Sequence, residues 1–133
     1  SRSRLVEFCT QKLGLKMGNK VKHQIDIPSW IKENRKFYIA CVRGLVDTDG
    51  SVFTHRYKVN KKQYAYKKLD FCSMSAPLRN SVYSILKEIE LHPRLKRNKI
   101  VRLNSIRDME RYFSIVGTHN PKHLKRYTAT PIL

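Results

Sequence analysis

The chain has 133 residues, with 28 Lys and Arg against 10 Asp and Glu, so its formal net charge is +18. A hydrophobic share of 41% is enough for a folded core and argues against disorder by composition. No apolar run approaches the ~20 residues of a membrane span, and the first residues lack a signal-peptide pattern. We therefore expect one folded unit of ordinary domain size whose partner is negatively charged.

The cysteines indicate the compartment. Cys9, Cys41 and Cys72 are odd in number, widely spaced and set among apolar residues. This pattern predicts buried free thiols in an intracellular, reducing compartment and disfavours a disulfide framework or a zinc module.

The first elements form a short extension. Residues 4–13 suit a helix, and residues 21–27 alternate like a strand that Pro28 closes. We place the extension at residues 1–27 and the main domain at residues 28–133, with Trp30 packing against that domain.

The main domain alternates helices with pairs of strands. Helical spacing is seen at 36–46, 76–89 and 106–116, and strand patterns at 51–59, 63–74, 91–96 and 99–103. Ser75 and Ser105 are predicted N-caps, with Asp108 completing a capping box. Residues 118–121 are predicted to be a loop. The order αββαββα predicts an α+β fold in which a four-stranded antiparallel sheet carries helices on one face and leaves the other open.

Basic residues concentrate in three stretches, 56–68, 94–102 and 122–126. Tyr57, Tyr64 and Tyr66 are interleaved with Lys and Arg in the first. Aromatic and basic side chains on a sheet suit a duplex groove or a stacked single strand. The alternative is a solvated face that only confers solubility.

The helix at 36–46 has an unusual composition. Gly44 lies inside it at a cost of about 1 kcal/mol relative to Ala, and with Ala40 it forms a small-residue stripe beside Phe37 and Asp47. The opposite face, with Tyr38, Val42 and Leu45, suits packing on the sheet. A second copy of the helix would cover the stripe, which predicts a homodimer with Phe37, Ala40, Gly44 and Asp47 at its interface.

The same helix leads to Asp49 and Gly50. If two copies cross at Gly44, their Asp49 carboxylates converge and require a divalent cation for joint ionisation. Mg²⁺ prefers such oxygen ligands, and a metal beside a nucleic-acid surface indicates phosphodiester hydrolysis. The alternative is that residues 47–50 are only a polar turn between helix and strand.

Residues 42–50, Val-Arg-Gly-Leu-Val-Asp-Thr-Asp-Gly, resemble the nine-residue signature of the LAGLIDADG homing endonucleases. The closing segment at 115–124 is also similar to the ends of many such domains, and the resemblance covers roughly residues 28–127. It implies a site-specific double-strand DNA endonuclease, associated with intron or intein mobility, that cleaves a partly palindromic site as a homodimer. The extension would then be a partial repeat or the end of a longer two-motif protein.

The resemblance also implies roles for single residues. Asp49 and Gly50 would hold Mg²⁺ or another divalent cation such as Mn²⁺, and Asp47 would be structural. Lys122 would be the basic catalytic residue, with Lys125 and Lys99 as alternatives. Ser73 or Ser75 stands where many members carry a glutamine. His119 and His123 are not expected to bind metal, because Pro121 lies between them and a His-Glu-x-x-His helix is missing.

Strand alternation predicts which side chains contact DNA across the open face, which would form a saddle over the duplex. Val52, Thr54, Leu69, Phe71, Leu95, Val101 and Leu103 are expected to point to the helices. Arg56 and Lys58 fit that inward phase badly and suggest a bulge or strong twist. The expected contacts are Ser51, Phe53, His55, Tyr57, Tyr66, Lys68, Asp70, Arg94, Lys96 and Arg102.

Two other functions remain open from the sequence. The same fold could serve as a DNA- or RNA-binding module without cleavage, as in splicing cofactors or regulators. A basic structural or ribosome-associated protein would explain the charge but neither Gly44 nor Asp49.

Overall fold

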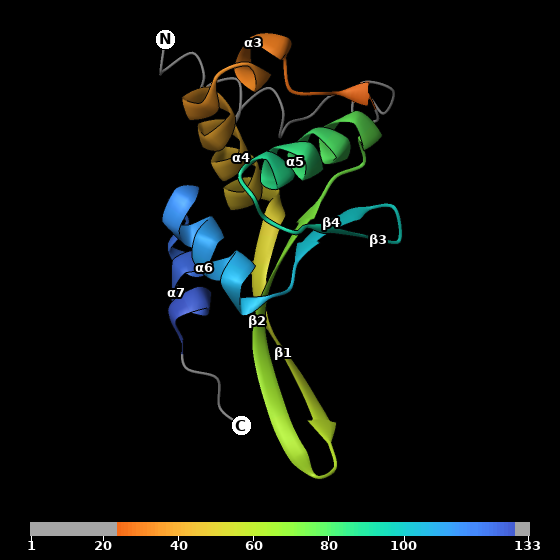
Figure 1. Cartoon of the computed structure of the whole chain (residues 1–133), viewed down its shortest axis with the longest axis vertical. Coiled ribbons are helices and arrows are strands. Elements are labelled where there is room, and N and C mark those ends of the chain that lie inside the picture. The colour runs from red at the N-terminus through yellow and green to blue at the C-terminus, as the bar shows by residue number, and fades with distance from the viewer. Residues whose placement is uncertain (1–23, 130–133) are drawn as a thin grey trace.

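A computed structural model describes residues 24–129 and has the predicted α+β fold (Figure 1). Its four strands form one antiparallel sheet in the order β1-β2-β4-β3. The helices and strands are α3 (Ser29–Lys32), α4 (Arg35–Asp49), β1 (Gly50–Val59), β2 (Lys62–Cys72), α5 (Ala76–Glu88), β3 (Arg94–Lys96), β4 (Ile100–Leu103), α6 (Ile106–Ile115) and α7 (Pro121–Thr128).

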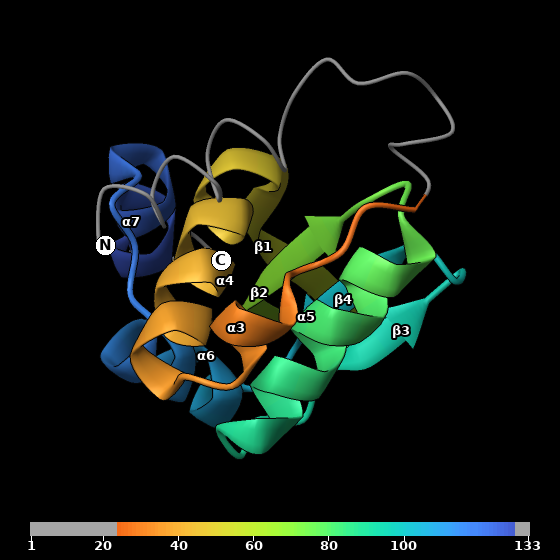
Figure 2. The same cartoon turned by 90° about the horizontal axis from the view of Figure 1, so that it is seen from above.

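The helices cover one face of the sheet, as the alternation predicts (Figures 1 and 2). The inward side chains that form the core under the helices are almost fully buried: Val52, Leu69, Phe71, Val101 and Leu103. Leu95 was expected among them, but 44% of it is exposed, because β3 is a three-residue edge strand outside the helical layer.

α4 is longer than predicted and carries both aspartates of the signature in its last turn. Asn34 caps its start by accepting a hydrogen bond from the Phe37 amide (3.2 Å). Near its end, the Thr48 hydroxyl donates to the Gly44 carbonyl (2.7 Å) and the Gly50 amide bonds to the Val46 carbonyl. The helix therefore runs without a break from the apolar stripe to Asp49.

The β1–β2 hairpin extends beyond the helices (Figure 1). Its turn is only Asn60 and Lys61, with φ of 51° and 68°, so Lys62 already belongs to β2. The pairing from Gly50 to Val59 is continuous, so the bulge expected at Arg56 and Lys58 is absent. These two side chains point to the helical side but lie past most of it, which leaves them exposed.

A further prediction of local structure, the capping box at α6, was partly right. Before that helix, Arg97 and Asn98 form the tight turn between β3 and β4, with φ of 55° and 54°. Ser105 caps α6 through the Asp108 amide (3.0 Å). The Asp108 carboxylate does not close the capping box, because it accepts instead from the amide (3.0 Å) and ring Nδ1 (3.1 Å) of His92.

The segment before α3 is not a strand in its described part. Residues 25–28 lie outside the sheet and are bound to α5. The Ile25 carbonyl accepts from the Ser75 hydroxyl, and the Asp26 carboxylate accepts from the Ser81 hydroxyl, the Ile27 amide (2.7 Å) and Lys32 Nζ (2.9 Å). Ile27 is buried in the core. The predicted helix at 4–13 lies outside the described residues.

α7 was not predicted. The predicted loop holds for residues 118–120, but Pro121 already belongs to this helix. Asn120 caps it by accepting from the Lys122 amide (2.9 Å), and Asn at the cap with Pro in the first turn are ordinary helix-start signals. Gly117, with φ of 73°, follows the end of α6.

The prediction for the cysteines holds for one residue. Cys41 is buried, whereas Cys72 is exposed because it alternates with inward-pointing Phe71 at the end of β2. Cys9 lies outside the described residues. In the part of the chain that the structure describes, we find no helix long and apolar enough to cross a membrane.

Candidate nucleic-acid interface and metal-binding carboxylate

The pairing register brings the predicted contact residues together on the open face of the sheet. Across β1 and β2 the pairs are Ser51–Asp70, Phe53–Lys68 and His55–Tyr66. Arg102 of β4 lies beside Asp70 on one side and Arg94 of β3 on the other. All ten predicted side chains therefore share one face, as expected. Whether they contact DNA remains a prediction.

Asp70 and Arg102 bind each other across the strands. Arg102 Nε and a terminal nitrogen donate to the two carboxylate oxygens at 2.6 and 2.8 Å. The hydrogen bond to Asp70 raises the pKa of Arg102, against a smaller lowering by burial. The guanidinium also lies 5.5 Å from the centre of the Phe53 ring. Alternation predicted the face but not this pairing, which leaves Arg102 less free to bind a base or phosphate.

An aromatic cluster occupies the open face toward the hairpin tip. Tyr57 is nearly parallel to Tyr64, with ring centres 5.3 Å apart, and to Tyr66, at 5.9 Å. His55 lies 5.5 Å from Tyr57, and Lys62 Nζ lies 5.7 Å from the centre of the Tyr64 ring. Tyr64 was not among the predicted contacts, although the same alternation places it in this cluster.

Asp49 ends α4 at the base of β1, next to the open face. Its carboxylate is accessible to solvent and makes no hydrogen bond or ion pair with another side chain among the described residues. Partial burial raises the pKa of Asp49. The pKa of Cys72 is raised first by burial and then by Asp70, with a smaller contribution from Asp49. Asp49 is thus an unneutralised acidic group in a strongly basic molecule.

The turn after Asp49 requires glycine. A Cβ on Gly50 would lie 2.6 Å from the Val46 carbonyl oxygen, 2.9 Å from Val46 Cγ1 and 3.1 Å from the Asp70 carbonyl oxygen. Backbone atoms cannot yield as a flexible side chain does, so any larger residue would displace the helix from the sheet. Gly50 therefore fixes where the Asp49 carboxylate emerges.

His123 of α7 also contacts this turn. Its ring is buried, with Nε2 donating to the Gly50 carbonyl (3.1 Å) and Nδ1 3.7 Å from an Asp47 carboxylate oxygen. The Gly50 carbonyl, which the resemblance offers as a metal ligand, thus already accepts a hydrogen bond from His123. Sequence reasoning missed this contact because α7 itself was not predicted.

Asp47 binds the segment between α6 and α7. Its carboxylate accepts from the Thr118 hydroxyl and the His119 amide (2.8 Å), and its carbonyl accepts from Asn120 Nδ2 (2.9 Å). This is an intrachain role, which the assignment of Asp47 to a dimer interface did not anticipate. The two aspartates of the signature therefore differ: Asp47 binds within the chain, and Asp49 is left accessible.

The remaining face of α4 has the predicted composition. Phe37, Ala40 and Gly44 are half-buried, whereas Tyr38, Val42 and Leu45 on the opposite side belong to the core. Trp30 was expected to be a packing residue, yet 45% of it is exposed and its ring meets Phe37 edge-on at 5.8 Å. Trp30, Phe37, Ala40 and Gly44 form a partly exposed surface that we call the α4 stripe.

The other predicted site residues are dispersed. Lys122 is exposed in the first turn of α7, immediately before His123; Lys125 is exposed in α7 and Lys99 in the β3–β4 turn. The Ser73 carbonyl accepts from Arg79, and Ser75 caps α5. Within residues 24–129 no three His, Cys, Asp or Glu side chains are grouped to hold a metal ion. A metal at Asp49 would need further ligands from a second copy, from water or from phosphate.

Comparison with known proteins does not add to this description. No protein-family model matches the chain, and a search of curated proteins found no match.

Proposed function

We propose that this chain is a site-specific, divalent-metal-dependent endonuclease of double-stranded DNA, similar to the LAGLIDADG homing endonucleases and acting as a homodimer. One observation carries the proposal: α4 delivers the accessible Asp49 carboxylate, through the tight Gly50 turn, to the edge of an open face rich in basic and aromatic side chains. An acidic group here is otherwise costly, because the C-terminal end of a helix disfavours anions.

The open face supports binding to a duplex. Lys68, Arg94 and Lys96 make no ion pair with other described residues, so their charges are available to phosphates. From Ser51 to Tyr57 the strand covers about 20 Å at ~3.3 Å per residue. That length corresponds to about six base pairs of B-form DNA. Two copies related by symmetry would double the contact and favour a partly palindromic site.

The Asp49 carboxylate and the Gly50 carbonyl would hold a Mg²⁺ or Mn²⁺ ion, since both are oxygen donors of the kind these ions prefer. The bound ion would polarise the phosphate and stabilise the leaving oxygen. The chain itself supplies the fixed position of the carboxylate, through Gly50 and His123. Lys122, exposed beside His123, is the proposed group that stabilises charge on the phosphate.

The decisive experiment selects cleaved sites from a randomised duplex library, with Mg²⁺ and with EDTA. We expect the unmodified chain to enrich a partly palindromic sequence only with Mg²⁺. Asp49→Asn should reduce cleavage of that sequence by at least about 10³-fold, because it removes the ligand that places the ion. Its affinity for the uncleaved site should fall little or rise, since a negative charge near phosphate is lost.

Glu33→Gln is the matched control, because Glu33 is an exposed acid after α3, far from the turn in sequence. It changes the net charge equally and should leave cleavage intact. Cleavage by Asp49→Asn at the unmodified rate would refute the assigned role of Asp49.

A second function, binding of nucleic acid without cleavage, is favoured by one observation. The Gly50 carbonyl, one of the two proposed metal ligands, is already engaged by His123. In that case the library would yield retained but uncut sequences, and Asp49→Asn would retain them equally well.

A further inference from the structure

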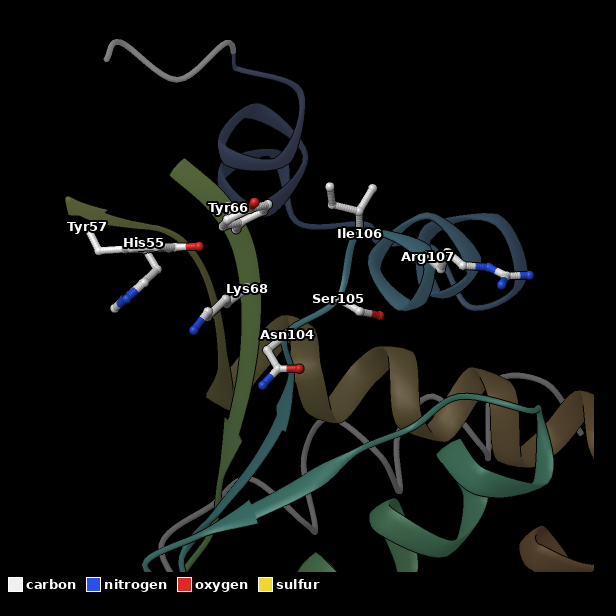
Figure 3. A pocket seen from close by; sticks show the side chains of 8 residues that line it. All are labelled: His55, Tyr57, Tyr66, Lys68, Asn104, Ser105, Ile106 and Arg107. Carbon is white, nitrogen blue, oxygen red and sulfur yellow. The ribbon is translucent and has the colours of Figure 1, made fainter. Parts of the chain in front are cut away.

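A notch opens beside β2 where β4 stops. The pairing between these two strands ends at Leu69 and Leu103, whereas β2 extends seven residues further toward its start at Lys62. On that side the edge of β2 beyond Leu69 therefore has no strand partner among the described residues. The chain instead turns away through Asn104 and Ser105 into α6. Figure 3 shows the side chains that line the notch: His55, Tyr57, Tyr66, Lys68, Asn104, Ser105, Ile106 and Arg107.

The two sides of the notch differ in chemistry. Tyr57 and Tyr66 lie on the strand side, nearly parallel and with ring centres 5.9 Å apart (Figure 3). Ile106, on the side of α6, is 57% exposed although it is a large apolar residue. Exposed aromatic and apolar surface facing a hollow is suited to a flat, largely apolar group.

Three polar side chains of the notch have no partner within the described chain. The Asn104 side-chain amide makes no hydrogen bond there, and Lys68 and Arg107 make no ion pair. By contrast, Arg102 on the same face is neutralised by Asp70. The notch thus offers one donor and one acceptor at Asn104, together with the positive charge of Lys68 on the side of the aromatic rings; the Arg107 side chain extends away from them (Figure 3).

We propose that this notch binds an unpaired nucleotide, an inference that rests on the proposed binding of nucleic acid by the open face. The base would stack on Tyr66, its edge would bond to the Asn104 amide, and its phosphate would lie against Lys68. An amide matches the adjacent donor and acceptor on a base such as adenine. Stacking on tyrosine requires an exposed base face, which a base within an intact duplex does not offer.

The test compares two DNA duplexes of one sequence, one fully paired and one with a single bulged adenosine, by fluorescence anisotropy without divalent metal. We expect the chain to bind the bulged duplex about 10-fold more tightly, in line with the usual effect of one base stacked on an aromatic ring. Asn104→Ala, at a residue outside the predicted duplex contacts, should reduce this preference to about 2-fold or less while affinity for the paired duplex stays within about 3-fold. Tyr66→Leu should reduce the preference to the same extent, whatever its effect on affinity for the paired duplex.

Tyr64→Leu is the control for Tyr66→Leu. Tyr64 lies on β2 like Tyr66 and also stacks on Tyr57, but it does not line the notch. It should keep the preference, as should Tyr66→Phe, which retains the ring. Circular dichroism checks that each variant is folded, and Asn104→Ala tests the notch without altering the aromatic cluster.

The outcomes separate this proposal from the proposed function. Equal affinity of the unmodified chain for both duplexes, or a preference that survives Tyr66→Leu and Asn104→Ala, overturns the notch as a nucleotide site. Failure to bind either duplex instead contradicts the nucleic-acid function itself.

Discussion

At the scale of single residues, a buried polar cluster joins α4, α6 and α7. Asp47 binds Thr118 and the His119 amide, and His123 lies within 3.7 Å of the Asp47 carboxylate. Arg43 Nε donates to the Val116 carbonyl at 2.6 Å nearby. Such contacts position α7 against the base of β1, and through His123 they support the turn that presents Asp49.

Two buried side chains of this region, His123 at Nδ1 and Tyr112 at its hydroxyl, each have an atom without a hydrogen-bond partner among the described residues. The Tyr112 side chain is fully buried. Burial, and then the nearby Asp47 charge, raise the pKa of Tyr112 well above its ordinary value.

We expect Tyr112→Phe to leave the free energy of unfolding unchanged or to raise it by about 1 kcal/mol, since a buried unpaired hydroxyl is costly. Tyr112→Leu, which also removes ring packing, should lower it; urea denaturation of both variants measures the difference. A loss above about 1 kcal/mol in Tyr112→Phe would show that the hydroxyl has a partner.

At the scale of the elements, the α4–β1 junction and the α5 contact fix the geometry of the site. α4 packs on the sheet through Tyr38, Val42 and Leu45, and it enters β1 within one residue. The segment at 25–27 holds α3 against α5 through Asp26. The residues just before the main domain therefore contribute to its core, since Ile27 is buried there.

The Gly50 turn gives a test at this scale. Gly50→Ala places a methyl group 2.6 Å from the Val46 carbonyl oxygen, so the helix end must move. We expect a loss of about 1–3 kcal/mol in the free energy of unfolding. Ser51→Ala, at the next position of β1, should have little effect on stability. Equal stabilities of Gly50→Ala and the unmodified chain in urea would contradict the close approach.

The Asp26 contacts predict acid sensitivity. Burial alone would raise the pKa of Asp26, but hydrogen bonds from Ser81, Lys32 and the Ile27 amide outweigh it and lower the pKa below 3.8. A carboxyl whose pKa is lower in the folded state stabilises the fold at pH values above its unfolded-state pKa. This stabilisation is lost as the pH falls through the folded-state pKa. We expect Asp26→Asn to be less stable than the unmodified chain at pH 7, with the difference shrinking below about pH 3.8. A difference in urea midpoint that stays constant from pH 7 to pH 2.5 would argue against this linkage.

At the scale of the whole molecule, the charge and the α4 stripe describe two separate surfaces. The basic side chains of the open face include Lys68, Arg94 and Lys96, whereas Arg102, Lys67 and Lys32 are engaged within the chain. The α4 stripe, with Trp30 45% exposed beside Phe37, is the surface that would pair in the proposed homodimer. Pairing there would bring the ends of two α4 helices, and their Asp49 residues, together.

Gly44→Leu tests that pairing. A leucine at the crossing point would keep two helices from approaching closely, so we expect the variant to sediment as a monomer at concentrations where the unmodified chain is dimeric. Lys36→Leu is the control, because Lys36 is exposed in the first turn of α4, away from Gly44. A Gly44→Leu chain that remains dimeric would exclude this interface.

The sequence alone determined the order of the strands along the chain, which of their side chains point to the helices, and three of the helices that cover them. The two-residue repeat of side-chain direction in a strand and the 3.6-residue turn of a helix are both local properties of the sequence. It also singled out Asp49 and Gly50 as a chemical feature. It did not find α7, although Asn120 and Pro121 are common helix-start residues, because this eight-residue, strongly basic helix has few apolar residues.

Tertiary structure decided what each polar side chain does. The Asp70–Arg102 pair, the binding of Asp47 by residues 118–120 and the contact of His123 with Gly50 all join residues more than 30 positions apart. The notch beside Tyr66 likewise exists only because β4 ends while β2 continues. Such contacts depend on the register of the strands and on where the strands end, which no local pattern specifies. They explain why Asp47 is bonded within the chain while Asp49 is left accessible to solvent.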